Sequence, residues 1–595
     1  MPRPEPPSFT VKEFILFALL AGAIATFSLG YNYGLGNHIE LLPHIERILD
    51  PSFAAGDFSV DSSAGGPRQY FARLGAVLAG RIPLPAVFFL LTLLQNAGTA
   101  VLTALAARKM FPQTAAAPIL AVLAVMTIEG PRLGGAGFLR LPTAVAFTVA
   151  TPLALAALWF GLAGRPMAAL MAAVPAVFIH PLVGLEISSL GVAAASIERF
   201  GTALRIGRGG RERGSAFRGG LASLGALAAL AVFAYVVWFR SQPPQLLDAN
   251  SFIGLYARFR APHHLWPAAF PPLDWIVAAI FYLAAAILAG RWIRRGPADR
   301  FLATRTVLVL GFLPIAAFTG WFFVQIVPLR LVTTLQLFRL TTVLKWLGYL
   351  LLAGAVGGLG RMSRSSSRAR HSGLLALGSA AVLIASSLGR IGEADLPIRQ
   401  QGLALGGIGL VAAAWLGPRR AWLRRLAPAV AAGMMIACLL WPASGRVPVI
   451  GGLLARTRPI FTLEQGAQRE DAAARFCRER LPEGSTVVVP PLLGRFRLVS
   501  RRALLTDFKF MPTADAALIE WRRRLEAAYG PWSGAGFAAA RSIDRGYRMI
   551  SPARLARLRA LYGVAYAVLY ADTPGPAAEI YRDRFFKVVR IPAGP

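Results

Sequence analysis

The stretch "PMAALMAAVPAVFIHPLVGLEISSLGVAAASIER", residues 166–199, decides how this chain is threaded through a membrane. As a single helix its roughly 34 residues, at about 1.5 Å each, would be ~50 Å long, whereas a bilayer core is ~30 Å thick. The dipeptide His180-Pro181 lies near its middle, and proline interrupts a helix because it lacks an N–H and restricts the residue before it. We therefore predict two short passes. A single pass would reverse the orientation of every later loop.

The composition on either side of this stretch indicates a polytopic membrane protein. Of 595 residues 55% are hydrophobic and only 15% are charged, with a mean hydropathy of +0.54. The net charge of +34 comes from arginines grouped between apolar segments, where they set topology and contact lipid headgroups, so nucleic-acid binding is excluded. Cys438 lies in an apolar segment and Cys477 in a polar one, which argues against a disulfide between them.

The hydropathy pattern predicts about thirteen transmembrane helices, each of about 20 residues. They lie near residues 13–30, 84–107, 114–128, 140–162, 166–180, 182–198, 219–239, 274–292, 303–324, 332–358, 373–390, 402–417 and 427–443. No small-residue cleavage site follows the first of them, so we expect it to be retained.

The distribution of arginine predicts the orientation. With two passes in 166–199, the basic loops all fall on the side of the N-terminus, which the positive-inside rule makes cytoplasmic. These loops contain residues 108–109, 199–218, 291–305, 361–370 and 419–425. The loops 31–83 and 240–272, and everything after Ala443, are then external. We expect a multi-pass protein of the bacterial inner membrane with a periplasmic or external C-terminus.

Two domains follow from this pattern. Residues 1–443 are predicted to form a mainly α transmembrane domain, and residues 444–595 a small external α/β domain. The second part alternates helical stretches with β-like ones, which is typical of α/β layers. The helical stretches are 465–480, 514–529 and 552–562, and the β-like ones are 486–489, 565–570 and 586–591.

Three segments carry a resemblance to a known superfamily. They are "NYGLGNHIELLPHIERILDPSFAAGDF" (32–58), "RFRAPHHLWP" (258–267) and "PPLLGRFRLVSRRALLTDFKFMP" (490–512). Together with the order of external loop, many spans and external C-terminal domain, they resemble bacterial members of the GT-C superfamily of integral-membrane glycosyltransferases. The resemblance implies transfer of a sugar from a polyprenyl-phosphate carrier to a glycan, lipid or protein acceptor, usually with inversion. The carrier and membrane lipid are the implied partners.

Such a displacement needs a carboxylate that accepts the acceptor's proton, and positive groups that stabilise the departing phosphate. The first external loop contains Asp50, Asp57 and Asp61. Asp57, in "AGDF", most resembles the acidic position of the family loop and is predicted to be the general base, with Asp61 as the second candidate. Asp50 precedes a proline and is expected to start a turn. The alternative is that all three are solvated loop acids.

The segment "YARFRAPHHLWP", 256–267, is the most distinctive polar cluster in the chain. Arg258 and Arg260 are predicted to bind phosphate, and His263 and His264 to donate hydrogen bonds or transfer protons. We predict no metal, because two adjacent histidines without a spaced third ligand define no metal geometry. The alternative is an interfacial loop whose arginines contact lipid headgroups.

Several charged residues lie at or within spans. Arg339, in the apolar segment 332–358, is predicted to meet the lipid-linked phosphate, with snorkelling to the headgroups as the alternative. His180 and Glu129 lie at external ends of spans and are further candidates for the substrate site. In the C-terminal domain, four residues are expected to anchor the domain over the membrane opening: Arg501, Arg502, Asp507 and Lys509.

Two other classes remain open at this point. A flippase or transporter of lipid-linked glycans would show interrupted helices in two related halves, and only one clear break is found, at His180-Pro181. A non-catalytic envelope assembly protein would need neither Asp57 nor the arginines. No residue pattern identifies a cofactor, a particular sugar or an acceptor.

Overall fold

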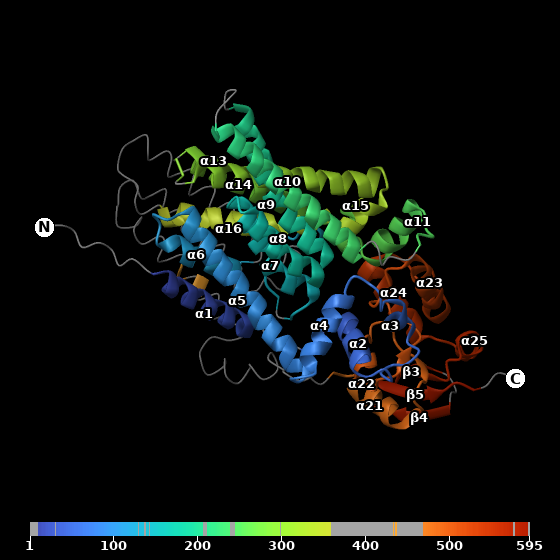
Figure 1. Cartoon of the computed structure of the whole chain (residues 1–595). Coiled ribbons are helices and arrows are strands. Elements are labelled where there is room, and N and C mark those ends of the chain that lie inside the picture. The colour runs from blue at the N-terminus through green and yellow to red at the C-terminus, as the bar shows by residue number, and fades with distance from the viewer. Residues whose placement is uncertain are drawn as a thin grey trace.

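The computed structural model describes residues 10–29, 31, 33–128, 130–135, 139–141, 143–205, 211–238, 244–294, 296–297, 299–358, 432–433, 435–436, 468–574 and 578–592. Within this part the chain forms a bundle of helices that ends against a smaller α/β region built from residues after 468 (Figure 1). The predicted spans 373–390, 402–417 and 427–443 lie outside the described residues, apart from four positions of the last. Glu129 also lies outside them.

The bundle consists of long apolar helices. They are α1 (Val11–Leu29), α5 (Leu84–Met110), α6 (Ala116–Thr127), α7 (Ala146–Leu162), α8 (Pro166–Ile179), α9 (Pro181–Arg205), α10 (Arg211–Trp238), α13 (Pro272–Arg294), α14 (Arg300–Trp321) and α16 (Thr341–Gly358). Six helical segments of the described chain are long and apolar enough to cross a membrane, and α6, α7 and α8 are shorter apolar helices. The structure therefore describes a multi-pass helical membrane protein, while the expected number of about thirteen spans is not confirmed.

The segment 166–199 forms two helices, as predicted. α8 ends at Ile179, His180 is extended with φ −149° and ψ 100°, and α9 begins at Pro181. The two helices turn back on each other so closely that a Cβ on Gly184 would lie 2.3 Å from the backbone nitrogen of Val177. Glycine is required at this contact because any side chain would separate the helices.

The centre of the bundle is the segment Arg330–Gly358. The most apolar 18 residues of this segment are 94% buried. It comprises α15 (Arg330–Leu335), the 3-10 turn η6 (Leu337–Leu340) and α16. Trp346, fully buried, donates a hydrogen bond from Nε1 to Thr103 Oγ1 of α5 at 3.0 Å. Polar pairing of this kind fixes the rotation of neighbouring helices whose apolar faces are otherwise alike.

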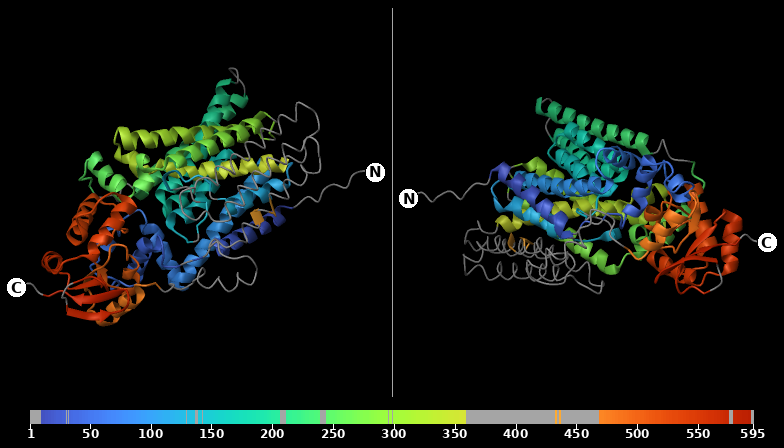
Figure 2. Two further views of the ribbon diagram at one scale, coloured as in Figure 1. Left: turned by 180° about the vertical axis from the view of Figure 1, so that it is seen from behind. Right: turned by 90° about the horizontal axis from the view of Figure 1, so that it is seen from below.

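Short elements gather at one end of the bundle, which we call its domain end. They are α2 (His38–Leu49), α3 (Phe58–Ser62), α4 (Gln69–Ala79), α11 (Ala249–Ile253), η3 (Gly254–Arg260), α12 (Pro262–Leu265), η4 (Pro267–Ala269) and η5 (Phe322–Ile326), together with η1 (Leu133–Gly135) and η6. Both views of Figure 2 show the blue α2 to α4 region beside the orange and red C-terminal elements.

The C-terminal region is a mixed five-stranded sheet with helices around it. Its strands are β1 (Thr486–Val488), β2 (Ala503–Leu504), β3 (Tyr566–Tyr570), β4 (Ala578–Arg582) and β5 (Phe586–Arg590), in the order β2-β1-β3-β5-β4. β1 is parallel to β2 and β3, whereas β5 is antiparallel to β3 and β4. The helices are α21 (Asp471–Arg480), α22 (Phe496–Ser500), α23 (Asp515–Tyr529), α24 (Gly536–Arg548) and α25 (Pro552–Tyr562). A small C-terminal α/β fold is thus present.

This region is attached to the bundle through a common core. Phe252 and Ala257 from the domain end and Val332 of α15 are buried in the same apolar cluster as the sheet residues. Arg330, at the start of α15, also binds the Asp515 carboxylate in a two-pronged ion pair at 2.5 and 2.7 Å. A bidentate pair of this type fixes orientation as well as distance. The bundle and the C-terminal region are therefore packed directly against each other.

Candidate functional site

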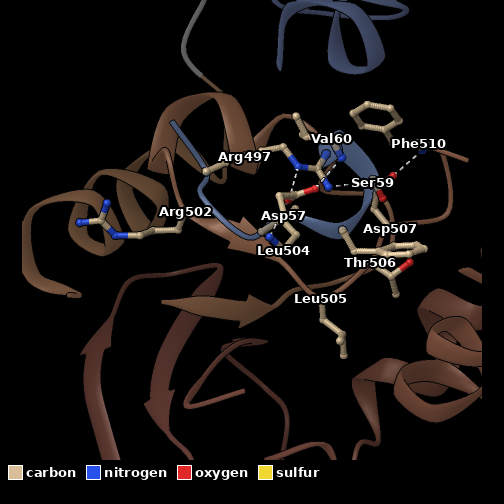
Figure 3. A network of polar contacts seen from close by, with 12 residues as sticks. Asp57, Ser59, Val60, Arg497, Arg502, Leu504, Leu505, Thr506, Asp507 and Phe510 are labelled. Atoms are coloured by element: carbon tan, nitrogen blue, oxygen red, sulfur yellow. Dashed lines mark hydrogen bonds and ion pairs between the residues drawn. The ribbon is translucent and has the colours of Figure 1, made fainter. Parts of the chain in front are cut away.

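Asp57 is fully buried where the first loop meets the C-terminal region (Figure 3). One carboxylate oxygen caps α3 by accepting a hydrogen bond from Val60 N at 3.1 Å. The other accepts from Arg497 Nε at 2.6 Å and from Leu504 N at 2.8 Å. Three donors from within the fold thus occupy this carboxylate, and the structure gives it a linking position between two parts of the chain that are 440 residues apart.

The Arg497 guanidinium is also fully buried and binds a second acid, Asp507, at 3.0 Å. We call Asp57, Arg497 and Asp507 the buried triad. The other Asp507 oxygen accepts hydrogen bonds from Lys509 N at 2.9 Å and Phe510 N at 2.6 Å. The triad therefore holds the backbone that carries the Lys509 side chain.

The other acids of the first loop lie nearer the surface. Asp61 binds Arg47 at 2.6 Å and its side chain is 46% exposed. Asp50 accepts hydrogen bonds from Ser52 and forms an ion pair with Arg501 of the C-terminal region. Arg502 points elsewhere and donates to two backbone carbonyls at 2.8 Å. Of the four residues expected to anchor the domain over the membrane opening, Arg501 and Lys509 contact the first loop, at Asp50 and Gly36, whereas Asp507 contacts Arg497.

A separate group of charges lies at the domain end, and three distant segments supply it. Glu40 of α2 binds Arg68 at 2.6 Å, and Arg260 of η3 lies 4.0 Å from the same carboxylate. Arg260 also donates to the backbone carbonyl of Lys509 at 2.7 Å, and Lys509 Nζ donates to the carbonyl of Gly36. We call Glu40, Arg68, Arg260 and Lys509 the charged cluster.

The charged cluster has an excess of positive charge, three cations around one acid. Burial opposes ionisation of Glu40, but the three neighbouring cations outweigh it and hold the pKa of this carboxyl below its usual value. The Arg68 side chain is 48% exposed, so its guanidinium remains accessible to a ligand. An anion that enters here would meet three hydrogen-bonding cations, and the ionised Glu40 could accept a proton beside it.

Neutral histidines surround this cluster. Burial, reinforced by nearby arginines, lowers the pKa of His44 to about 4, and burial with its neighbour His264 lowers that of His263 to about 3. Burial also lowers the pKa of His264, whose Nδ1 lies 3.0 Å from the Gly134 carbonyl. At neutral pH these rings therefore add no charge to the cluster. Within the described ranges, no group of three His, Cys, Asp or Glu residues could hold a metal.

The remaining predicted residues separate into two sets. Arg258 is exposed and stacks on Trp266 with its guanidinium carbon 5.3 Å from the ring centre, so it is not part of the charged cluster. Arg339 of η6 and His180 lie together, with Nη1 3.2 Å from Nε2. η6 packs against η1, and η1 contacts α12, which carries His263 and His264 and follows η3, so the Arg339–His180 pair lies near the histidines that follow Arg260.

Sequence reasoning did not identify Glu40 or Arg68, and it gave Lys509 only an anchoring role. Glu40 lies in the segment that carries the resemblance, four residues before His44, so the two share one face of α2. That spacing was the available signal. It was too weak to select Glu40 over Asp57, because the cations that surround Glu40 come from segments up to about 470 residues away.

Comparison with known proteins gives a domain family and several solved structures. The family described as "Domain of unknown function (DUF6798)" matches residues 468–528, and no curated protein matches the chain. ArnT from Cupriavidus metallidurans bound to undecaprenyl phosphate is 18% identical, with 98% of this chain and 99% of that chain covered and a TM-score of 0.43.

Two other solved structures show a similar degree of likeness. AglB from Archaeoglobus fulgidus, in complex with an inhibitory peptide and a dolichol-phosphate, is 12% identical over 94% of this chain and 70% of that one, with a TM-score of 0.44. EmbB from Mycobacterium smegmatis, an arabinosyltransferase, is 16% identical over 75% and 42%, with a TM-score of 0.42. AglB is an archaeal oligosaccharyltransferase and EmbB an arabinosyltransferase. TM-scores this low do not identify an activity for the present chain.

Proposed function

We propose that this protein is a GT-C-type membrane glycosyltransferase that moves a sugar from a polyprenyl-phosphate carrier to an acceptor. The observation that carries the proposal is the charged cluster, in which Arg68, Arg260 and Lys509 surround Glu40 at the end of an apolar bundle. Cations at the edge of a membrane domain suit a ligand whose phosphate is polar and whose tail is apolar.

The cluster supplies the two groups that the displacement requires. The acceptor oxygen attacks the anomeric carbon while the bond from that carbon to the phosphate oxygen breaks, and the carrier phosphate leaves with the bonding electrons. The three cations stabilise this phosphate, and Glu40 takes the proton of the acceptor hydroxyl. We propose Glu40 for this step because its carboxylate faces the cations, whereas the oxygens of Asp57 are occupied by three donors. That Asp57 or Asp61 is the base stays a prediction, which the same measurements test.

The first test is phosphate binding. Arg260→Ala should weaken binding of decaprenyl phosphate to the purified protein by about 10- to 100-fold, since a charge-assisted hydrogen bond to the phosphate is lost. Arg258→Ala is the matched control, because Arg258 lies two residues away in η3 but stacks on Trp266 instead. Titration in detergent, followed by intrinsic tryptophan fluorescence, measures both. Equal weakening in the two variants would contradict the proposed phosphate site.

The second test concerns orientation. In this proposal the charged cluster lies on the external face of the bacterial inner membrane and the N-terminus is cytoplasmic. The reason is that the basic loops connect the transmembrane helices on the side opposite to the cluster. An alkaline phosphatase fused after Pro595 should therefore be active, and a fluorescent protein that folds only in the cytoplasm should be dark at the same position. The reverse pattern would move the site to the cytoplasmic face.

Carrier binding without sugar transfer would favour the remaining alternatives. A flippase or an assembly protein would bind prenyl phosphate through the same cations but would need no base at Glu40. Transfer of a radiolabelled sugar in liposomes separates these classes.

A further inference from the structure

Glu186 is a buried acid that the proposed reaction does not use. It lies in the second turn of α9, about 8 Å along the helix from Pro181, and its exposure is 7%. Neither of its carboxylate oxygens has a hydrogen-bond partner among the residues that the structure describes. A carboxylate at this depth in a bundle is costly unless it serves a ligand or a partner group.

The surroundings of Glu186 place it next to the charged cluster. α9 packs against the turn η6, and Arg339 of η6 lies 3.2 Å from His180, the residue just before α9. η6 also packs against η1, whose Gly134 carbonyl lies 3.0 Å from Nδ1 of His264 in α12, and α12 contacts η3, which carries Arg260 of the charged cluster. Glu186, Arg339 and the cluster therefore follow one another from the interior of the bundle towards the C-terminal region.

The missing partners of Glu186 define the chemistry of its ligand. A cationic ligand would meet repulsion from the Arg339 guanidinium in the packed turn η6. What the carboxyl group lacks is hydrogen-bond partners, and a buried polar group without partners is strongly unfavourable. Neutral hydroxyl groups, such as adjacent hydroxyls on a sugar ring, supply donors without adding charge.

We propose that Glu186 recognises the sugar of the donor by accepting hydrogen bonds from its hydroxyl groups. This inference rests on the proposed function, because it assumes that a carrier phosphate binds at the cations of the charged cluster. Glu186 then acts as a specificity-determining residue on the bundle side of the phosphate, separate from Glu40, which takes the acceptor proton.

The test compares the bare carrier phosphate with three of its sugar esters. Decaprenyl phosphate and decaprenyl-phosphate esters of glucose, mannose and arabinose are titrated against the wild-type protein and the Glu186→Ala and Glu186→Gln variants. At least one ester should bind wild-type protein more tightly than bare decaprenyl phosphate. Both variants should lose about 10- to 100-fold of affinity for that ester and keep their affinity for the bare phosphate. Arg260→Ala should weaken both ligands alike.

Thermal unfolding separates recognition from a structural role. Because the Glu186 carboxyl has no hydrogen-bond partner to lose, the Tm of Glu186→Gln should be unchanged or raised, whereas replacement of a residue that holds the fold together would lower it. The inference is overturned if no ester binds the wild-type protein more tightly than bare decaprenyl phosphate, or if both variants keep the full preference for the ester. It is also overturned if the Tm of Glu186→Gln falls below that of the wild-type protein. If the wild-type protein binds neither ligand, the proposed function itself fails.

Discussion

Glu40→Gln is expected to reduce sugar transfer by roughly 10²- to 10⁴-fold, the usual contribution of a general base. Glutamine keeps the size of the side chain and can still accept a hydrogen bond from Arg68, but it cannot accept the acceptor's proton. Binding of decaprenyl phosphate should be retained or strengthened, because the change removes a negative charge beside three cations. Transfer of a labelled sugar in liposomes, together with the binding titration, measures the two effects separately.

Two other carboxylates make this result specific. Glu46→Gln is the matched control, since Glu46 lies on the same helix but faces Arg501 at 3.4 Å and is outside the charged cluster. Asp57→Asn tests the earlier candidate. Full transfer by Glu40→Gln, with a loss of 10²-fold or more in Asp57→Asn at unchanged stability, would make Asp57 the base and would refute the assignment of Glu40.

The break at His180-Pro181 could be predicted from sequence because its causes are local. Helix length per residue, the thickness of a bilayer and the missing N–H of proline act within a few residues of the dipeptide. The small α/β region could be predicted for the same reason, since alternation of helical and β-like stretches is visible along the chain. The order β2-β1-β3-β5-β4 could not, because it depends on which strand edges meet in space.

The role of each acid was harder to predict, because it depends on which residues contact the carboxylate in the folded protein. Asp57 and Glu40 lie 17 positions apart in one loop, and both are flanked by apolar residues. Arg497 and Leu504 surround the first, whereas Arg68 and Arg260 surround the second. Only the tertiary fold brings these residues together. The sequence of the loop alone therefore favoured Asp57, whose neighbours resemble the acidic position of the family loop.

The roles of the arginines also depend on contacts that only the folded protein shows. Arg258 and Arg260 are two residues apart and were predicted to act together on a phosphate. η3 is π-helical, and Arg260 reaches Lys509 and Glu40 while Arg258 stacks on Trp266. Residues two apart do not share a helix face, so the shared role was not required by their spacing.

Arg497→Met is expected to destabilise the protein by about 3–5 kcal/mol, because it leaves Asp57 and Asp507 buried without their common cation. All three members of the buried triad are fully buried, so water cannot replace the lost partner. The change should also loosen the loop that carries Lys509, and thereby weaken binding of decaprenyl phosphate. Thermal unfolding in detergent measures the first effect and ligand titration the second.

The controls separate charge imbalance from loss of packing. Arg545→Met removes an exposed arginine of α24 and should leave the Tm nearly unchanged. The triple variant Asp57→Asn, Arg497→Met, Asp507→Asn should recover much of the stability that the single variant loses, since no unpaired charge is then left in the interior. If Arg497→Met unfolds at the wild-type temperature, the triad does not hold the first loop to the C-terminal region. The position of Lys509 must then be maintained by its hydrogen bond to Gly36 and by Arg260 alone.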